Sequence, residues 1–105
     1  MPDLDALDMD EYRAEVLRYQ TILAKAPEFD WLIRRGDKLW WTIKELATEL
    51  QLGETTIVKW IDQGLVPVWR DSGGSRGREI ARSSVIFHLG REHTGWYRQQ
   101  QSQAS

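Results

Sequence analysis

The sequence predicts a mainly α-helical fold with one small β-hairpin, and three observations support this expectation. Residues 42–64, TIKELATELQLGETTIVKWIDQG, hold two stretches of apolar residues at helical spacing with a short break between them. Residues 66–82 hold two short strand-forming stretches on either side of a glycine-rich segment. Helical spacing returns at residues 83–90. A chain of 105 residues is expected to form one domain with a small core.

The first helix of the central segment is predicted to begin after Thr42. Glu45 lies three residues further on, which is the spacing of a capping box, in which each side chain accepts a hydrogen bond from the other residue's backbone N–H. The apolar stripe of this helix consists of Ile43, Leu46, Ala47 and Leu50. Gln51, Leu52 and Gly53 follow as a tight turn. We expect Leu52 to be buried in this turn and Gly53 to supply its unusual backbone angles.

The second predicted helix covers residues 54–63 and ends at Gly64, because glycine readily adopts the left-handed conformation that terminates helices. Its inward stripe consists of Ile57, Trp60 and Ile61. The opposite face carries Thr55, Val58, Lys59 and Asp62, with Glu54 and Thr56 on its flanks. A helix with one apolar stripe and small or polar residues near its N-terminus suits the major groove of DNA.

A β-hairpin is predicted next, with strands at residues 66–69 and 78–82 and a loop at residues 71–77. Pro67 has no backbone N–H, which places its strand at an edge of the sheet. Four arginines lie within thirteen residues here: Arg70, Arg76, Arg78 and Arg82. Guanidinium groups on a glycine-rich loop suit contacts with phosphate or with a narrow minor groove. The alternative is that these arginines only keep an exposed hairpin soluble.

The closing helix is predicted to begin at Ser83 or Ser84, since either hydroxyl can cap it. Its inward residues are Val85, Ile86 and Leu89. From about Arg98 the sequence RQQQSQAS is polar and low in complexity, so we expect it to be disordered. Trp96 and Tyr97, just before this tail, are expected to pack on the body of the protein.

The segment before residue 39 predicts two further helices. The first runs from Asp8 or Asp10 to about Lys25, with Tyr12, Val16, Tyr19 and Leu23 on one face. The second is short, because Pro27 suits a first helical position and Gly36 suits its end. Its buried face would hold Phe29, Leu32 and Ile33. An alternative is a hairpin that pairs residues 31–33 with residues 39–41.

We therefore divide the chain into an acidic helical extension (residues 1–38), a central domain (residues 39–92) and a C-terminal tail (residues 93–105). The formal net charge is −2, but it is unevenly distributed. Residues 1–30 hold eight acidic residues and three basic ones, whereas residues 31–105 hold eleven basic residues and eight acidic ones. The extension either covers the small core, serves as a dimerisation arm, or screens a basic face until a partner displaces it.

Several classes of function lack support in the sequence. The chain has no cysteine, which excludes disulfides and cysteine-based catalysis. It contains no phosphate-binding loop, G-x-S-x-G turn or H-E-x-x-H motif, so we expect no enzyme activity. His88 and His93 are not spaced for one helix face, so no metal or other cofactor is expected. No apolar run approaches the roughly 20 residues of a membrane span, and we expect a cytoplasmic protein without a membrane partner.

A known sequence pattern recurs between residues 41 and 89. It consists of an aromatic residue, T-x-x-E-x-A, L-G-V-S-x-x-T-V-x-x-W-I-x-x-G, a short hairpin and a closing helix. This chain matches it at Trp41, Thr42, Glu45, Ala47, Leu50, Leu52, Thr56, Ile57, Trp60, Ile61 and Gly64. On these residues the chain resembles the excisionase and MerR-type family of winged helix-turn-helix domains. It departs from that family at Gln51 and Gly53, where the family has glycine and serine.

The resemblance implies a small non-catalytic protein of a bacterium or phage that binds a specific sequence of double-stranded DNA. Its role would be that of an excisionase-like recombination factor or a transcriptional regulator, acting as a homodimer or cooperative oligomer on DNA. No small-molecule effector is expected, because the effector-binding coiled coil of MerR-type proteins is missing. The expected DNA-binding residues are Thr42, Lys44, Glu54, Thr55, Thr56, Lys59, Arg70, Arg76, Arg78 and Arg82.

Two alternatives remain open at this stage. The first is the DNA-recognition subunit of a phage packaging terminase, because residues 63–68, QGLVPV, and the Gly73-Gly74 pair resemble features of that family. The second is a protein–protein interaction module built on the same fold, in which the basic hairpin has no role in binding.

Overall fold

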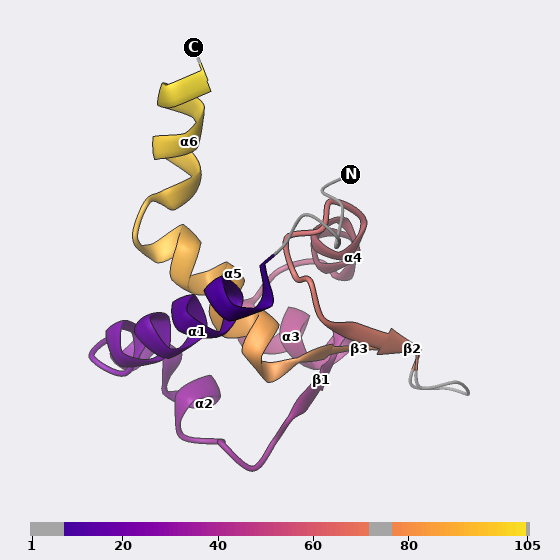
Figure 1. Cartoon of the computed structure of the whole chain (residues 1–105). Coiled ribbons are helices and arrows are strands. Elements are labelled where there is room, and N and C mark those ends of the chain that lie inside the picture. Colours follow the sequence, from indigo (N-terminus) through magenta and orange to yellow (C-terminus); the bar gives the residue numbers. More distant parts are fainter. Residues whose placement is uncertain (1–7, 72–76, 105) are drawn as a thin grey trace.

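The computed structural model of the protein describes residues 8–71 and 77–104, with side chains described through residue 100. Helices form most of this chain, and a small antiparallel sheet completes it (Figure 1). In chain order the elements are α1 (Met9–Leu23), the 3-10 helix η2 (Pro27–Phe29), α2 (Asp30–Ile33), β1 (Trp40–Thr42), α3 (Ile43–Leu50), α4 (Glu54–Asp62), β2 (Trp69–Asp71), β3 (Arg78–Ala81), α5 (Arg82–His93) and α6 (Trp96–Ala104). Within the described ranges, no helix has both the length and the apolar character needed to cross a membrane.

The sheet has the strand order β1-β3-β2, so the predicted hairpin of β2 and β3 gains an additional strand on its other side. Trp41 of β1 lies opposite Ile80 of β3, and Ile80 lies opposite Trp69 of β2. Trp41 and Ile80 are buried against the core. The alternative hairpin with residues 31–33 does not form, because these residues belong to α2 and β1 pairs with β3. The first strand of the hairpin was predicted at residues 66–69, but β2 covers Trp69–Asp71 and Pro67 lies just before it. β2 is an edge strand, as predicted for the first strand of the hairpin.

The predicted capping box is present at the start of α3. The Thr42 hydroxyl accepts a hydrogen bond from the Glu45 backbone N–H at 3.1 Å, and the Glu45 carboxylate accepts one from the Thr42 N–H at 3.0 Å. Lys38, in the loop before β1, donates a further hydrogen bond to Glu45 at 2.6 Å. Burial by itself would raise the pKa of Glu45, but the bonds from Lys38 and Thr42 outweigh it and lower that pKa.

The turn between α3 and α4 differs from the prediction. Gln51, and not Gly53, adopts the left-handed conformation, with a φ of 56°. Leu52 is 41% exposed instead of buried. The corner is closed by a backbone hydrogen bond from the Leu52 N–H to the Ala47 carbonyl, so it does not require the leucine side chain. The left-handed residue expected after α4 is confirmed at Gly64, which has a φ of 73°.

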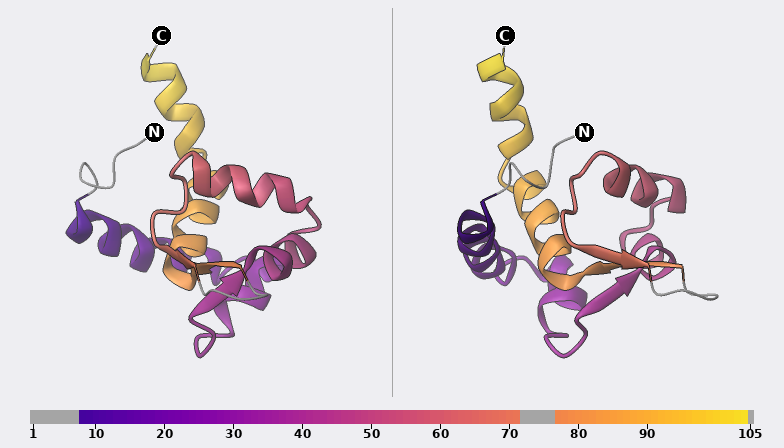
Figure 2. Two further views of the ribbon diagram at one scale, coloured as in Figure 1. Left: turned by 90° about the vertical axis from the view of Figure 1, so that its right-hand side faces the viewer. Right: turned by 45° about the vertical axis from the view of Figure 1, so that its right-hand side comes forward.

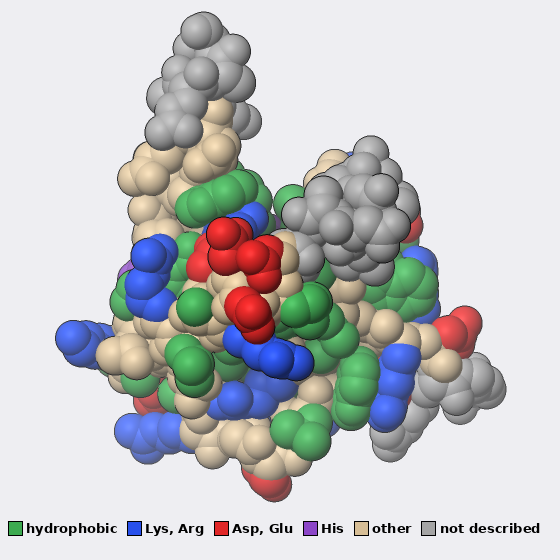
Figure 3. Space-filling view, in the orientation of Figure 1, with side chains coloured by type: hydrophobic (Ala, Val, Ile, Leu, Met, Phe, Trp, Pro, Cys, Tyr) green, Lys and Arg blue, Asp and Glu red, His purple; other side chains and the backbone are tan. Residues whose placement is uncertain are grey.

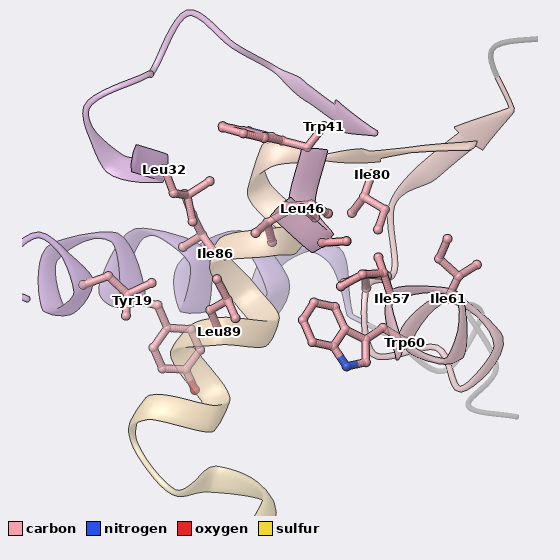
Figure 4. Close-up of a cluster of buried hydrophobic side chains, with 14 residues drawn as sticks. Tyr19, Leu32, Trp41, Leu46, Ile57, Trp60, Ile61, Ile80, Ile86 and Leu89 are labelled. Atoms are coloured by element: carbon pink, nitrogen blue, oxygen red, sulfur yellow. The ribbon is translucent and has the colours of Figure 1, made fainter. Parts of the chain in front are cut away.

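α5 lies at the centre of the molecule, and each residue from Ser84 to Gly90 is buried. α1 packs along one side of it, and α3 and α4 lie on the other (Figures 2 and 4). A single cluster of buried side chains includes Tyr19, Leu23, Leu32, Trp41, Leu46, Ile57, Trp60, Ile80, Ile86 and Leu89. The extension at residues 1–38 therefore contributes to the same core as the central domain, which confirms the predicted inward face of its first helix.

Ser83 and Ser84 do not cap α5, contrary to the prediction. The N-cap position is Ala81, which makes no side-chain hydrogen bond. Instead, the Ser84 hydroxyl accepts a hydrogen bond from the Val68 N–H at 2.8 Å and lies 2.9 Å from the Tyr12 hydroxyl. The Ser83 hydroxyl lies 2.7 Å from the same tyrosine oxygen. These contacts join α1, α5 and the segment that leads into β2.

The tail predicted to be disordered from Arg98 continues as α6 in the structure, and this helix extends away from the body (Figure 1). Glutamine has a good intrinsic helix propensity, and the start of the helix is anchored. The Tyr97 hydroxyl lies 2.8 Å from Nδ1 of His88, and the Arg91 guanidinium lies 3.7 Å from the centroid of the Trp96 ring. The expectation that Trp96 and Tyr97 pack on the body is confirmed.

Arg91 also joins α5 to α1. Its guanidinium makes two hydrogen bonds to the Glu15 carboxylate, at 3.1 and 2.8 Å, and the Tyr19 hydroxyl donates a third at 2.9 Å. Burial by itself would raise the pKa of Glu15. The hydrogen bonds from Arg91 and Tyr19 outweigh this effect and hold the pKa of Glu15 below its ordinary value.

We expect Glu15→Gln to remove part of the acid sensitivity of folding. Because the pKa of Glu15 is lower in the folded chain than in the unfolded chain, its stabilisation is present above the unfolded value and is lost as the pH falls through the folded value. At neutral pH the variant should be less stable by about 1.5 kcal/mol, as charge-assisted bonds are lost. Denaturant titrations from neutral to acidic pH measure both effects. Glu28→Gln, at an exposed residue of η2, is the control. If the unfolding free energy of Glu15→Gln depended on pH in the same way as that of Glu28→Gln, the proposed contribution of Glu15 to acid sensitivity would be contradicted.

Gly90 is a point of very close approach between α5 and α1. A Cβ atom at this position would lie 2.2 Å from Cγ and 2.4 Å from Cβ of Tyr19. We expect Gly90→Ala to lower the free energy of unfolding by ~1–3 kcal/mol, because α1 and α5 would have to move apart to accommodate the added methyl group. Gly36→Ala is the control, since nothing lies within 4 Å of that position, and it should change stability by less than about 0.5 kcal/mol. Thermal denaturation of the two variants measures the difference, and equal stability would argue against the close contact.

Candidate nucleic-acid interface

α4 buries one face and exposes the other. Ile57, Trp60 and Ile61 are buried in the core, as predicted (Figure 4). On the outer side Glu54, Thr55, Thr56 and Lys59 are exposed. The structure therefore brings four of the predicted site residues together on one solvent-facing surface in the first two turns of α4.

Contacts behind Trp60 fix the orientation of α4. The Trp60 ring lies 4.3 Å, centroid to centroid, from the imidazole of His88 on α5. Nδ1 of His88 lies within hydrogen-bond distance of the Tyr97 hydroxyl on α6, and Nε2 lies 2.9 Å from a carboxylate oxygen of Glu92. The contact with His88 lowers the pKa of Glu92. α4 is thus supported by α5 and, through His88, by α6. The only sign of this arrangement in the sequence was a histidine, His88, within a run of apolar residues.

The hairpin of β2 and β3 lies on the same side of the molecule as α4 (Figures 1 and 2). An ion pair connects them, because Nη1 of Arg78 lies 3.8 Å from Oδ1 of Asp62 near the end of α4. Both side chains are partly exposed, so the pair contributes little to stability. The Arg78 guanidinium also lies 5.7 Å from the centroid of the exposed Trp69 ring. The ion pair between Arg78 and Asp62 matters because it keeps a cation of the hairpin beside α4.

Arg70 occupies the opposite face of the sheet from Trp69. Nε of Arg70 lies 3.1 Å from Oε1 of Glu79, and the guanidinium stacks 4.0 Å from the centroid of the Trp40 ring. Glu79 is only 4% exposed, and a buried carboxylate requires such pairing. Trp40 was not among the site residues predicted from the sequence. The signal for it was the Trp40-Trp41 pair, since neighbouring strand residues point to opposite faces and only one of them can enter the core.

Arg82 lies apart from the other predicted arginines. Its guanidinium donates hydrogen bonds to the backbone carbonyls of Leu32, at 3.3 Å, and Ile33, at 3.0 Å. These carbonyls close the C-terminal end of α2, where backbone oxygens lack helical partners. Burial lowers the pKa of Arg82. The side chain therefore attaches α2 to the start of α5, and we leave it out of the candidate interface.

The remaining residues that were predicted to bind DNA lie in different environments. Thr42 uses its hydroxyl in the capping box, whereas Lys44 is exposed in the first turn of α3. Arg76 lies outside the described residues. Exposed charges on α3 and α4 are mixed, since Lys44 and Lys59 are accompanied by Glu49, Glu54 and Asp62. The hairpin is mixed as well, since Arg70 and Arg78 are accompanied by Asp71 and Glu79.

Comparison with protein families, with characterised proteins and with solved structures finds no match for this chain. In the described part of the chain, no three histidine, aspartate or glutamate side chains gather in a way that could hold a metal ion. The functional assignment accordingly depends on the chemistry and geometry of the surface that α4 and the hairpin form.

We expect truncation of Trp60 to act on folding and truncation of Thr55 to act only on the exposed surface. Trp60→Ala removes a large buried ring between α4 and α5 and should cost ~3–5 kcal/mol of unfolding free energy. Thr55→Ala is the matched control on the outer face and should change stability by less than about 0.5 kcal/mol. Denaturant unfolding measures both values. Similar costs for the two variants would contradict the orientation of α4.

Proposed function

We propose that this protein binds a specific sequence of double-stranded DNA without catalysis, and that α3, α4 and the hairpin act as a winged helix-turn-helix. The observation that carries the proposal is the exposed polar face of α4 beside a hairpin cation, Arg78, that is linked to Asp62. A helix with its side chains is about 10–12 Å wide, and the major groove of B-DNA is about 12 Å wide. The outer face of α4 therefore fits that groove, with the hairpin reaching the adjacent backbone.

Each exposed residue of α4 has a contact that suits its chemistry. Thr55 and Thr56 are small, which allows close approach to base edges, and their hydroxyls donate and accept hydrogen bonds. Lys59 reaches a base edge or a neighbouring phosphate. Glu54 accepts a hydrogen bond from a cytosine amino group. Lys44, at the start of α3, contacts a phosphate of the flanking backbone.

The hairpin contributes cations from two faces of the sheet. Arg70 keeps 51% of its side chain exposed while it pairs with Glu79. Arg78 exchanges its partly exposed contact with Asp62 for a phosphate at small cost, because exposed ion pairs are weak. Arg76 lies in the segment between β2 and β3, and we assign it the same role on the basis of its place in the sequence.

The acidic residues of the chain are compatible with this proposal. α1 and α4 lie on opposite sides of α5 (Figure 2), so the acidic start of α1 is separated from the outer face of α4, although it lies near Val68, just before the hairpin. At physiological salt the screening length is about 8 Å. Glu54 and Asp62 lie on α4 itself and repel phosphates, which weakens binding to unrelated DNA and increases the dependence on base contacts.

The same binding mode would serve an excisionase-like recombination factor, a transcriptional regulator or the DNA-recognition subunit of a packaging terminase. Selection of the preferred site from a random library, followed by location of that site in the genome that encodes the protein, distinguishes these roles. A site at a recombination end, at a promoter or at a packaging start would identify one of them.

A protein–protein interaction module is the second candidate. The observation that favours it is Leu52, an exposed apolar side chain in the turn, with the acidic residues Glu49 and Glu54 nearby in sequence. Such a surface suits a basic and apolar protein partner. This candidate predicts no measurable affinity for DNA at low salt.

We expect the protein to bind duplex DNA with a strong salt dependence. Contacts with about five phosphates from Lys44, Lys59 and the hairpin arginines would give a slope near −4.5 in a plot of log affinity against log salt concentration. Lys59→Gln should reduce the magnitude of this slope by about 0.9. Fluorescence anisotropy with a labelled random-sequence duplex at several salt concentrations measures both quantities.

The matched control for this experiment is Lys25→Gln, which removes an exposed lysine just after α1. It should leave the affinity and the slope unchanged. A slope near zero for the unmodified protein, or equal losses for Lys59→Gln and Lys25→Gln, would contradict DNA binding through α4.

A further inference from the structure

The outer face of α1 carries an exposed stripe that is separate from the candidate interface. Its inner face packs on α5 through Tyr12, Tyr19 and Leu23. On the outer face, exposed residues recur at intervals of three and four: Ala14, Leu17, Thr21 and Ala24. This is the spacing of a seam between two paired helices. Leu17 is 68% exposed, more than the other large apolar side chains of the described residues.

A hollow of about 470 Å³ lies beside this stripe. It is lined mainly by apolar groups, and its residues are Met9, Tyr12, Arg13, Val16, Leu17, Val68 and Ser83. Met9, at its rim, is 46% exposed. Leu17 and the hollow that it helps to line form one apolar patch, and a two-fold interface places the same patch on both partners.

The charges on α1 favour one orientation of a second copy. Glu11 and Arg18 are exposed, lie two helical turns apart, and fall on the same side of the stripe. In an antiparallel pair whose two-fold axis passes between Ala14 and Leu17, Glu11 of each copy lies beside the partner's Arg18. In a parallel pair, Glu11 of one copy would lie on the opposite side of the seam from Arg18 of the partner, so these two residues could not pair. Figure 3 shows acidic side chains gathered over the start of α1, and basic side chains both directly beneath them and toward the other end of the helix.

We infer that α1 is a self-association surface through which two copies of this chain pair by their α1 helices in antiparallel orientation. Leu17 of each copy packs against the partner's Ala14, whose small side chain leaves room for it, and Glu11 pairs with the partner's Arg18. α4 stays exposed in the dimer, because it lies on the other side of α5 from α1 (Figure 2). Two copies would then present two α4 helices to two half-sites of one duplex.

This use on DNA rests on the proposed function, but self-association is measured without DNA and can fail independently of it. Sedimentation equilibrium of the full chain over a wide range of concentration should show a monomer–dimer equilibrium. Leu17→Glu should leave only monomer, because it places a carboxylate at the centre of the seam. Leu39→Glu is the matched control at a leucine that is 62% exposed in the loop before β1, and it should dimerise as the unmodified chain does.

An exchange of charges tests the antiparallel orientation. Glu11→Arg or Arg18→Glu alone should weaken dimerisation by about tenfold, because two attractive pairs become repulsive. An equal mixture of these two variants should regain the affinity of the unmodified chain, and so should the double variant. Thermal denaturation followed by circular dichroism must first show that the variants fold, since Arg18 also contacts Tyr19.

Three outcomes would overturn the inference. The first is a chain that remains monomeric at all concentrations. The second is a dimer that Leu17→Glu does not dissociate. The third is a mixture of the two charge variants that stays as weak as each variant alone.

Discussion

The structure depends on the burial of α5 around its whole circumference. Each residue from Ser84 to Gly90 is buried, so apolar side chains leave this helix in every direction and each direction requires a covering element. α1 covers one side of α5, and Trp60 of α4 covers another. β3 contacts α5 as well, and Tyr97 of α6 contacts His88 of α5. The N-terminal extension is therefore a necessary part of the core. Without α1, the apolar side of α5 that contacts Tyr19 and Leu23 would face water.

This central helix also determines where a binding surface can lie. α4 uses its apolar stripe against α5 and α3, which leaves only its polar face for a ligand. α1 uses Tyr12, Tyr19 and Leu23 in the same way and leaves its own outer stripe free. The two exposed helix faces consequently point away from each other. A protein of this size can present two separate contact surfaces because a single buried helix separates the elements that carry them.

The sequence predicted the elements whose signals are local. The T-x-x-E spacing at Thr42, the left-handed Gly64 and the apolar stripe of α4 each depend on a few neighbouring residues, and the structure confirms them. Residues 39–41 were predicted as a strand only in the alternative hairpin with residues 31–33. The pairing of β1 with β3 was missed because it joins residues about forty positions apart, and three residues carry too little pattern to indicate it. The burial predicted for Leu52 was wrong because that turn is closed by a hydrogen bond from the Leu52 backbone N–H, which does not depend on the side chain.

Side-chain roles were harder to predict than elements. The four arginines of the hairpin looked equivalent in sequence, yet Arg82 binds carbonyls of α2 whereas Arg70 neutralises a buried glutamate. The different roles of Arg70 and Arg82 follow from the strand register and from the position of α2. Both are set by the tertiary structure and cannot be read from the local sequence. Ser83 and Ser84 were assigned to a cap for the same reason: their position at a helix start is a local signal, but the tyrosine that binds them comes from α1. The candidate DNA-binding face of α4 could be predicted because it requires only helical periodicity.

The position of β2 at the edge of the sheet has a consequence for the solubility of the protein. An edge strand presents unpaired backbone groups that can recruit a strand from another molecule and begin aggregation. Here the strand is only three residues long, Pro67 interrupts the backbone donors just before it, and two of its three side chains, Arg70 and Asp71, carry charge. These features oppose edge-to-edge stacking of sheets whether or not DNA is present. A change that lengthened this strand or replaced its charges with apolar groups would expose the protein to fibril formation.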